Sequence, residues 1–139
     1  MKEKIAQAAS FLKSNKFENT DTAIILGTGL GKLIEKVEII AEIEYEKIPH
    51  FPTATVEFHG GSLVYGSLNG VKVIVLHGRF HLYEGYSLEE VTFPVRVLAE
   101  LGVKSLVVSN AAGALNLSYR KGDLMMITDH INLQSNALI

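Results

Sequence analysis

The densest group of chemically capable side chains lies at residues 77–86, directly after an apolar run at 73–76. Ligands bind beyond the carboxyl ends of strands in open α/β sheets, so this position favours a site. Arg79 presents a planar guanidinium suited to phosphate oxygens, and His81 offers a further hydrogen bond. Glu84 is close enough in sequence to orient the His81 imidazole. The alternative is a surface pair of Arg79 with Glu84, but the density of polar and aromatic groups favours a site.

A glycine-rich loop, Gly27-Thr28-Gly29-Leu30-Gly31, follows another apolar run. Its backbone N–H groups could converge on an anion at a helix start. The spacing does not match a Walker A loop, because Leu26 stands where that motif needs a glycine. It also differs from the dinucleotide fingerprint G-x-G-x-x-G, which disfavours a Rossmann-type nucleotide binder. Taken alone, the loop is interpreted equally well as an anion site or as a tight turn that needs small residues.

A third loop, Asn110–Asn116, contains small residues that permit close backbone approach, and Asn110 supplies both a donor and an acceptor. By itself this pattern is more typical of a packed turn than of a site. The chain has five histidines and no cysteine. His77 and His81 lack the H-E-x-x-H arrangement or carboxylates of a metal centre, so we expect no metal site.

The composition limits the class of protein. The 139 residues fit one domain, and 47% hydrophobic with 20% charged residues favour a packed core over disorder. The 13 Lys and Arg against 15 Asp and Glu leave a net charge of −2, which argues against nucleic-acid binding. The absence of cysteine excludes disulfides and thiolate catalysis. The sequence has no run of 18 consecutive apolar residues, so no membrane span is predicted. The charged start at Met1–Ile5 does not resemble a signal peptide, and we therefore expect a cytoplasmic protein.

Two long helices are predicted, and a short helical stretch is predicted after the glycine loop. Apolar residues at helical spacing indicate an opening helix to about Lys16. Ser87 and Glu90 have the spacing of a capping box for a helix that runs toward Leu101 and is closed by Gly102. Pro94 lies within that second helix, either in its early turns or at a kink.

Six strands are predicted, and the Asn69-Gly70 pair between two of them is typical of a hairpin turn. The hairpin requires antiparallel pairing, whereas strands alternating with helices favour parallel pairing. We therefore expect an α/β fold in which helices flank a mixed central β-sheet, as a single domain over 1–139. In the second strand, alternation places the odd-numbered residues on the buried face. The predicted strands cover residues 22–26, 39–45, 62–65, 71–76, 105–108 and 123–128.

Together, these segments resemble the N-terminal half of the trimeric purine nucleoside phosphorylases, between about residues 24 and 133. The most specific segment is Gly78-Arg-Phe-His-Leu-Tyr-Glu-Gly-Tyr86, and its occurrence together with Asn110-Ala-Ala-Gly makes a chance match improbable. The remaining segments that carry the resemblance are Leu26-Gly-Thr-Gly-Leu-Gly31, Phe51-Pro-Thr and His59-Gly-Gly.

The resemblance implies a role for each matching residue. His81 and Glu84 correspond to a catalytic histidine and the carboxylate that holds it. Tyr83 and Asn110 correspond to positions beside the ribose. The implied phosphate-binding positions are Thr28, His59, Arg79, His81 and the backbone of Ala111.

The implied reaction is phosphorolysis of a purine nucleoside to free purine and ribose 1-phosphate, with phosphate as co-substrate, no cofactor and a homotrimeric assembly. The residues that recognise the base are expected beyond Ile139. We therefore expect a truncated nucleoside phosphorylase-like sheet with exposed apolar surface and unpaired strand edges. Two alternatives stay open: a phosphate- or nucleoside-binding fragment without turnover, and an enzyme like the methylthioadenosine phosphorylases.

Overall fold

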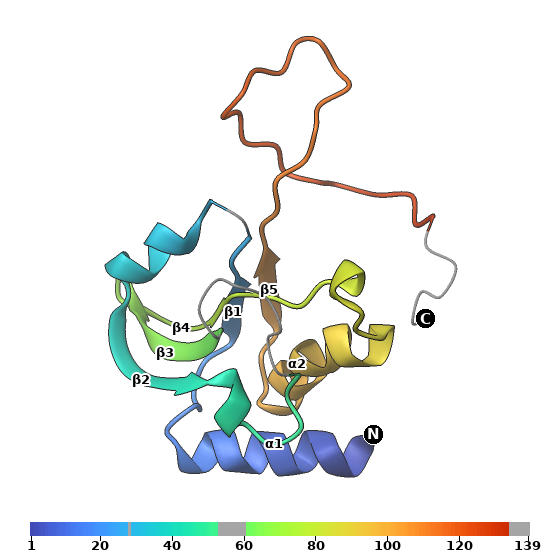
Figure 1. The fold of residues 1–139 in the computed structure, drawn as a ribbon. Coiled ribbons are helices and arrows are strands. Elements are labelled where there is room, and N and C mark those ends of the chain that lie inside the picture. Colours follow the sequence, from blue (N-terminus) through green and yellow to red (C-terminus); the bar gives the residue numbers. More distant parts are fainter. Residues whose placement is uncertain (28, 53–60, 134–139) are drawn as a thin grey trace.

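The computed structural model describes residues 1–27, 29–52 and 61–133. Its strands form one five-stranded sheet with the order β2-β3-β4-β1-β5 (Figure 1). The strands are β1 (Thr22–Ile25), β2 (Glu38–Glu44), β3 (Ser62–Leu68), β4 (Val71–His77) and β5 (Ser105–Val108). The helices are α1 (Lys2–Ser14) and α2 (Leu88–Glu100), with short 3-10 helices η1 (Gly31–Lys36), η2 (Tyr45–Lys47) and η3 (Leu82–Glu84).

The sheet is mixed, as predicted. β1 pairs in parallel with both β4 and β5, whereas β2, β3 and β4 form an antiparallel meander. In the register, Ala23 of β1 lies between Ile74 of β4 and Leu106 of β5. Because these three strands run in the same direction, their carboxyl ends meet at one edge of the sheet. The loops that follow them are the glycine loop, the segment beginning at Gly78 and the segment beginning at Ser109.

The main core lies between one face of the sheet and both α-helices. Alternate side chains of β1, β3 and β4 point to this face, and α1 and α2 also contact each other. The helices contribute Ala8, Ala9, Leu12, Phe93, Val97 and Leu98, and the strands contribute Ala23, Ile25, Leu63, Tyr65, Ile74 and Leu76.

The opposite face is covered less deeply. Its buried residues are Leu26, Val37, Val64, Val73 and Val75, and Leu33 and Ile34 of η1 pack against them. Helices therefore flank the sheet on both sides, but the two α-helices share one side, and a 3-10 helix covers the other.

Three local predictions are confirmed. Asn69 and Gly70 have positive φ angles of 51° and 82° at the β3–β4 hairpin, as a turn of this kind requires. Ser87 and Glu90 form the complete capping box of α2. Gly102, at φ 95°, follows the end of that helix, and its N–H donates to the Ala99 carbonyl.

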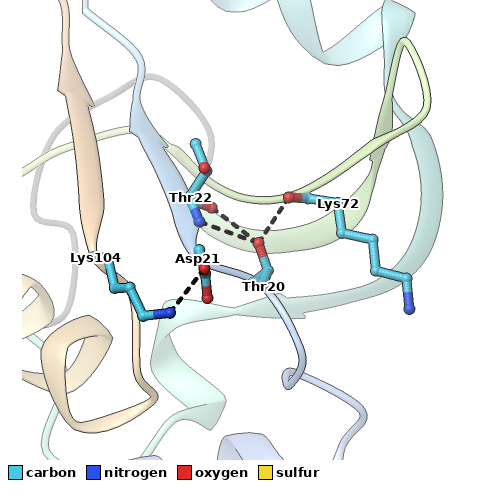
Figure 2. Close-up of polar contacts among 5 residues, drawn as sticks. All are labelled: Thr20, Asp21, Thr22, Lys72 and Lys104. Carbon is cyan, nitrogen blue, oxygen red and sulfur yellow. Dashed lines mark hydrogen bonds and ion pairs between the residues drawn. The ribbon is translucent and has the colours of Figure 1, made fainter.

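At the amino end of β1, a buried threonine links two strands (Figure 2). The Thr20 hydroxyl donates to the Lys72 carbonyl at 2.7 Å and accepts from the Thr22 N–H at 3.3 Å. An exposed ion pair of Lys104 with Asp21, 2.9 Å apart, lies beside it. These contacts lie at the start of the parallel strands, opposite the edge with the candidate site.

Several elements differ from the predictions, most of them by one to three residues at an end, and two of the differences have a clear local cause. α1 ends at Ser14 because Lys16 adopts a positive φ of 75°, and the Asn15 side chain donates to the Phe11 carbonyl at the helix end. In β2 the pairing register shifts between Ile39 and Ala41. The irregularity turns Ile39 outward, so it is exposed although alternation placed it on the buried face.

The predicted strand at 123–128 is wrong. Residues 109–133 form neither helix nor strand, and Figure 1 shows this segment extending away from the sheet. A strand needs a neighbour to pair with its backbone groups, and this segment does not return to the β5 edge. Its apolar side chains are exposed, as are Leu106, Val107 and Val108 of β5. The expected exposed apolar surface and unpaired edge are confirmed.

None of the helices among the described residues is both long enough and apolar enough to span a membrane.

Candidate functional site

The candidate site lies where the loops after β1, β4 and β5 meet. After β4, Gly78 adopts a φ of 104°, a conformation that favours glycine, and the chain turns there into the Arg79–Tyr86 segment. Phe80 of this segment is buried and packs in the core against Tyr45, with the two rings tilted by 45° and their centroids 5.2 Å apart. Since Phe80 is anchored, the residues on either side of it are held at the sheet edge.

Arg79 reaches from the β4 loop to the β5 loop. Its Nη1 donates to the Ser109 carbonyl at 3.1 Å, and its Nε donates to Nε2 of His81 at 3.3 Å. The guanidinium is half-buried and always protonated, so it places a positive charge between two loops. The remaining N–H groups of its planar fork suit an oxyanion.

His81 is held from both sides of its ring. Because Nε2 accepts from Arg79, the ring proton lies on Nδ1, which donates to the Glu84 carboxylate. The Glu84 side chain is only 8% exposed. The structure thus confirms that Glu84 orients the imidazole, and the alternative surface pair of Arg79 with Glu84 is not formed.

Tyr83 lies over the same histidine. Its ring stacks on His81 with centroids 4.6 Å apart and an interplanar angle of 20°. Its side chain is nevertheless among the most exposed large side chains, at 82%. An aromatic ring that is fixed by stacking and open to solvent on its other face is available to a ligand.

A cleft of about 680 Å³ opens beside these side chains. Arg79, His81 and Tyr83 line its polar end, and apolar residues of α2 and β5 line the rest, among them Leu88, Val91, Leu106 and Val108. The combination of an apolar wall with a few polar groups is typical of small-molecule sites.

Tyr45 is a residue of this region that sequence reasoning did not single out. Its hydroxyl donates to the Gly78 carbonyl at 2.7 Å, and its ring packs against Gly61. Burial raises the pKa of the Tyr45 hydroxyl far above its ordinary value. The available signal was the alternation in the strand predicted over 39–45, which placed this tyrosine on the buried face.

Ser109 is a second residue that sequence reasoning did not single out. Its hydroxyl accepts the Gly27 N–H at 2.9 Å and donates to the Ile25 carbonyl at 3.2 Å. It therefore joins the β5 loop to the start of the glycine loop. The hydroxyl is 82 residues from its Gly27 partner, so no local pattern could have indicated the contact.

The structure brings Arg79, His81, Glu84 and Tyr83 together. Asn110 and Ala111 directly follow Ser109 and are exposed. The two other predicted phosphate-binding residues, Thr28 and His59, lie outside the described residues. Within the described parts of the chain, no group of three or more His, Cys, Asp or Glu side chains could hold a metal ion, and the predicted absence of a metal stays a prediction.

Comparison with known proteins identifies the class. Residues 21–138 match the family model of the phosphorylase superfamily, so the chain belongs to that superfamily. Within it, the chain is similar to purine nucleoside phosphorylases. Purine nucleoside phosphorylase 1 of Bacillus subtilis (strain 168) is 55% identical over 140 residues, covering 100% of this chain and 52% of the relative. The purine nucleoside phosphorylase of Rattus norvegicus is 50% identical over 127 residues, which cover 91% of this chain and 44% of the relative.

The fold comparison agrees. A crystal structure of isoform 2 of purine nucleoside phosphorylase from Schistosoma mansoni, in complex with cytosine and ribose-1-phosphate, superposes with a TM-score of 0.81 at 45% identity. The superposition covers 87% of this chain and 42% of the Schistosoma mansoni chain. The resemblance read from the motifs and the predicted nucleoside phosphorylase-like fold are confirmed. The chain spans about half the length of the curated relatives it matches.

Proposed function

We propose that this chain carries the phosphate and ribose side of a site for purine nucleoside phosphorolysis. The observation that carries the proposal is the Arg79–His81–Glu84 arrangement at the carboxyl edge of the parallel strands. The relative that superposes on the chain is in complex with ribose-1-phosphate, one product of such a reaction.

The proposed chemistry uses phosphate as the nucleophile. One phosphate oxygen forms a bond to the anomeric carbon while the glycosidic C–N bond breaks, and the purine nitrogen takes the bonding electrons. Positive charge develops on the sugar as that bond weakens, as in glycoside hydrolysis. A phosphate held beside the anomeric carbon stabilises this charge before it bonds.

Arg79 and His81 are proposed to hold the phosphate, together with Thr28, His59 and the backbone N–H of Ala111. The Arg79 fork supplies paired donors to the phosphate oxygens. With Nδ1 donating to Glu84, Nε2 of His81 is an acceptor, and it would accept a hydrogen bond from the protonated oxygen of hydrogen phosphate while Arg79 donates to the other oxygens. Glu84 therefore acts by orienting and supporting the imidazole.

Tyr83 and Asn110 are proposed to face the ribose. The Tyr83 ring already stacks on His81, so a sugar beside it would lie close to the phosphate. Asn110 follows Ser109, whose carbonyl accepts from Arg79, and its amide offers both a donor and an acceptor to hydroxyl groups.

The test measures free purine released from inosine and guanosine by the purified chain, with and without phosphate. The proposal predicts phosphate-dependent release that is lost in Arg79→Ala and kept in Arg96→Ala, a control on α2. Release that does not depend on phosphate would contradict it. If no purine is released, a phosphate titration followed by NMR decides between the binding fragment without turnover and a chain that has no phosphate site.

Release from 5′-methylthioadenosine in preference to inosine would favour the enzyme like the methylthioadenosine phosphorylases. The homotrimer is also a proposal, supported by the exposed apolar residues of β5 and the following segment, and light scattering coupled to size exclusion tests it. The cytoplasmic location stays a prediction that cell fractionation checks.

A further inference from the structure

One residue outside the predicted set connects the three loops of the site. Ser109 is the first residue after β5, and its backbone N–H donates to the Ile25 carbonyl at 3.2 Å. Its hydroxyl donates to the same carbonyl and accepts the Gly27 N–H. Both the main chain and the side chain of Ser109 thus bind the end of β1.

Ser109 also accepts a hydrogen bond from Arg79. The Ser109 carbonyl accepts from Arg79 Nη1 at 3.1 Å. This carbonyl lies so close to Gly27 that a Cβ added there would overlap its oxygen and lie 2.8 Å from its carbon. Since the carbonyl and the Gly27 backbone are in contact, a shift of the glycine loop moves the acceptor of Arg79.

We propose that Ser109 is a positioning residue that couples the glycine loop to the Arg79 guanidinium, and thereby sets the affinity for phosphate. The inference rests on the proposed function, in which both elements face the phosphate. When the hydroxyl is removed, the half-buried Gly27 N–H loses its acceptor and β1 loses a link to β5. Arg79 keeps its own charge but binds a carbonyl that is no longer held in place.

The experiment titrates inorganic phosphate into the 139-residue chain and follows binding by calorimetry and NMR. Ser109→Ala is expected to weaken phosphate binding by roughly three- to tenfold, the range that loss of one hydrogen bond produces. Ser109→Thr keeps a hydroxyl and is expected to bind within about twofold of wild type. Ser109→Val matches threonine in shape without the hydroxyl and is expected to behave like alanine.

Ser105→Ala is the matched control, because it removes a hydroxyl from the same strand at the end away from the site. Equal binding by Ser109→Thr and Ser109→Val would overturn the proposal, since shape and not the hydroxyl would then matter. The affinities compared are those of the folded chain, because a variant that is merely less stable but still folded at the titration temperature keeps the phosphate affinity of wild type.

A second measurement uses the wild-type chain and needs no variant to fold. The signals of the Gly27 amide and the Arg79 Nε–H are both expected to shift when phosphate is added, and a Gly27 amide that stays unchanged while the Arg79 Nε–H shifts would overturn the coupling. If wild type binds no phosphate, the proposed function fails, and the role of Ser109 fails with it. A different result overturns only the role of Ser109: wild type binds phosphate, Arg79→Ala does not bind it, and Ser109→Ala binds it as tightly as wild type.

Discussion

The Tyr45 hydroxyl donates a 2.7 Å hydrogen bond to the carbonyl of Gly78, the residue that turns the chain from β4 toward Arg79. The tyrosine is 1% exposed, and its ring contacts both Phe51 and Phe80. The core of the protein therefore contacts the candidate site through Tyr45 as well as through the buried Phe80. A change in this contact alters the peptide that precedes Arg79.

Tyr45→Phe removes only the hydroxyl and leaves a buried carbonyl without its partner. We expect a loss of about 1–3 kcal/mol in the free energy of unfolding, measured by urea denaturation. Tyr119→Phe removes an exposed hydroxyl and should change the stability little. An equal effect of the two variants would show that the Gly78 contact contributes nothing.

The same bond predicts a pH dependence. Burial raises the pKa of Tyr45 in the folded chain, whereas an unfolded tyrosine ionises near pH 10. The stability from the buried neutral hydroxyl is therefore complete below pH 10 and is lost as the pH rises above it. The stability difference between wild type and Tyr45→Phe should narrow above pH 10. A constant difference up to pH 11 would contradict this prediction.

Gly27→Ala should disturb the site more than Gly31→Ala, although both glycines belong to one loop. An added Cβ at Gly27 overlaps the Ser109 backbone, whereas at Gly31 its nearest neighbour is Nε2 of His77 at an ordinary 3.8 Å. We expect Gly27→Ala to lose about 1–3 kcal/mol of stability and to weaken phosphate binding. Gly31→Ala should stay close to wild type. Thermal unfolding and phosphate titration check both, and similar behaviour of the two variants would contradict the predicted contact.

Thr20→Val should cost more stability than Lys104→Met, although Lys104 pairs with Asp21, the residue that follows Thr20 (Figure 2). The valine variant loses a buried hydrogen bond to the Lys72 carbonyl, for which we expect about 1 kcal/mol. The Lys104 ion pair with Asp21 is exposed and screened by salt, so its loss should have a smaller effect. Chemical denaturation of both variants at low and high salt tests the order.

The α2 capping box predicts a dependence on acid pH. Hydrogen bonds from the Ser87 backbone and hydroxyl lower the pKa of Glu90 from its ordinary 4.5. This contribution to stability is present above the unfolded pKa and is lost as the pH falls through the lower folded value. The melting temperatures of wild type and Glu90→Gln should therefore converge below about pH 4. Glu89→Gln removes a charge from the same helical turn but leaves the capping box intact, so its melting temperature at neutral pH should stay closer to that of wild type than that of Glu90→Gln does.

Much of the fold followed from local patterns. The hairpin at Asn69-Gly70 and the capping box at Ser87 depend on residues at most three positions apart, so their geometry is contained in the segment itself. The β2 irregularity at Ile39 was not predictable in this way, because a register shift depends on how β3 packs against β2. The strand expected at 123–128 failed for a related reason, since a short apolar run does not show whether a pairing partner is present.

The contacts of the candidate site also fall into local ones and long-range ones. The sequence by itself determined the His81–Glu84 pair and the placement of Arg79 after a buried strand, because these groups are neighbours along the chain. Only the tertiary structure decided that Ser109 meets Gly27 and that Tyr45 meets Gly78, contacts that span 82 and 33 residues. The physical reason is the strand order: with β1 between β4 and β5, three distant loops meet at one edge of the sheet.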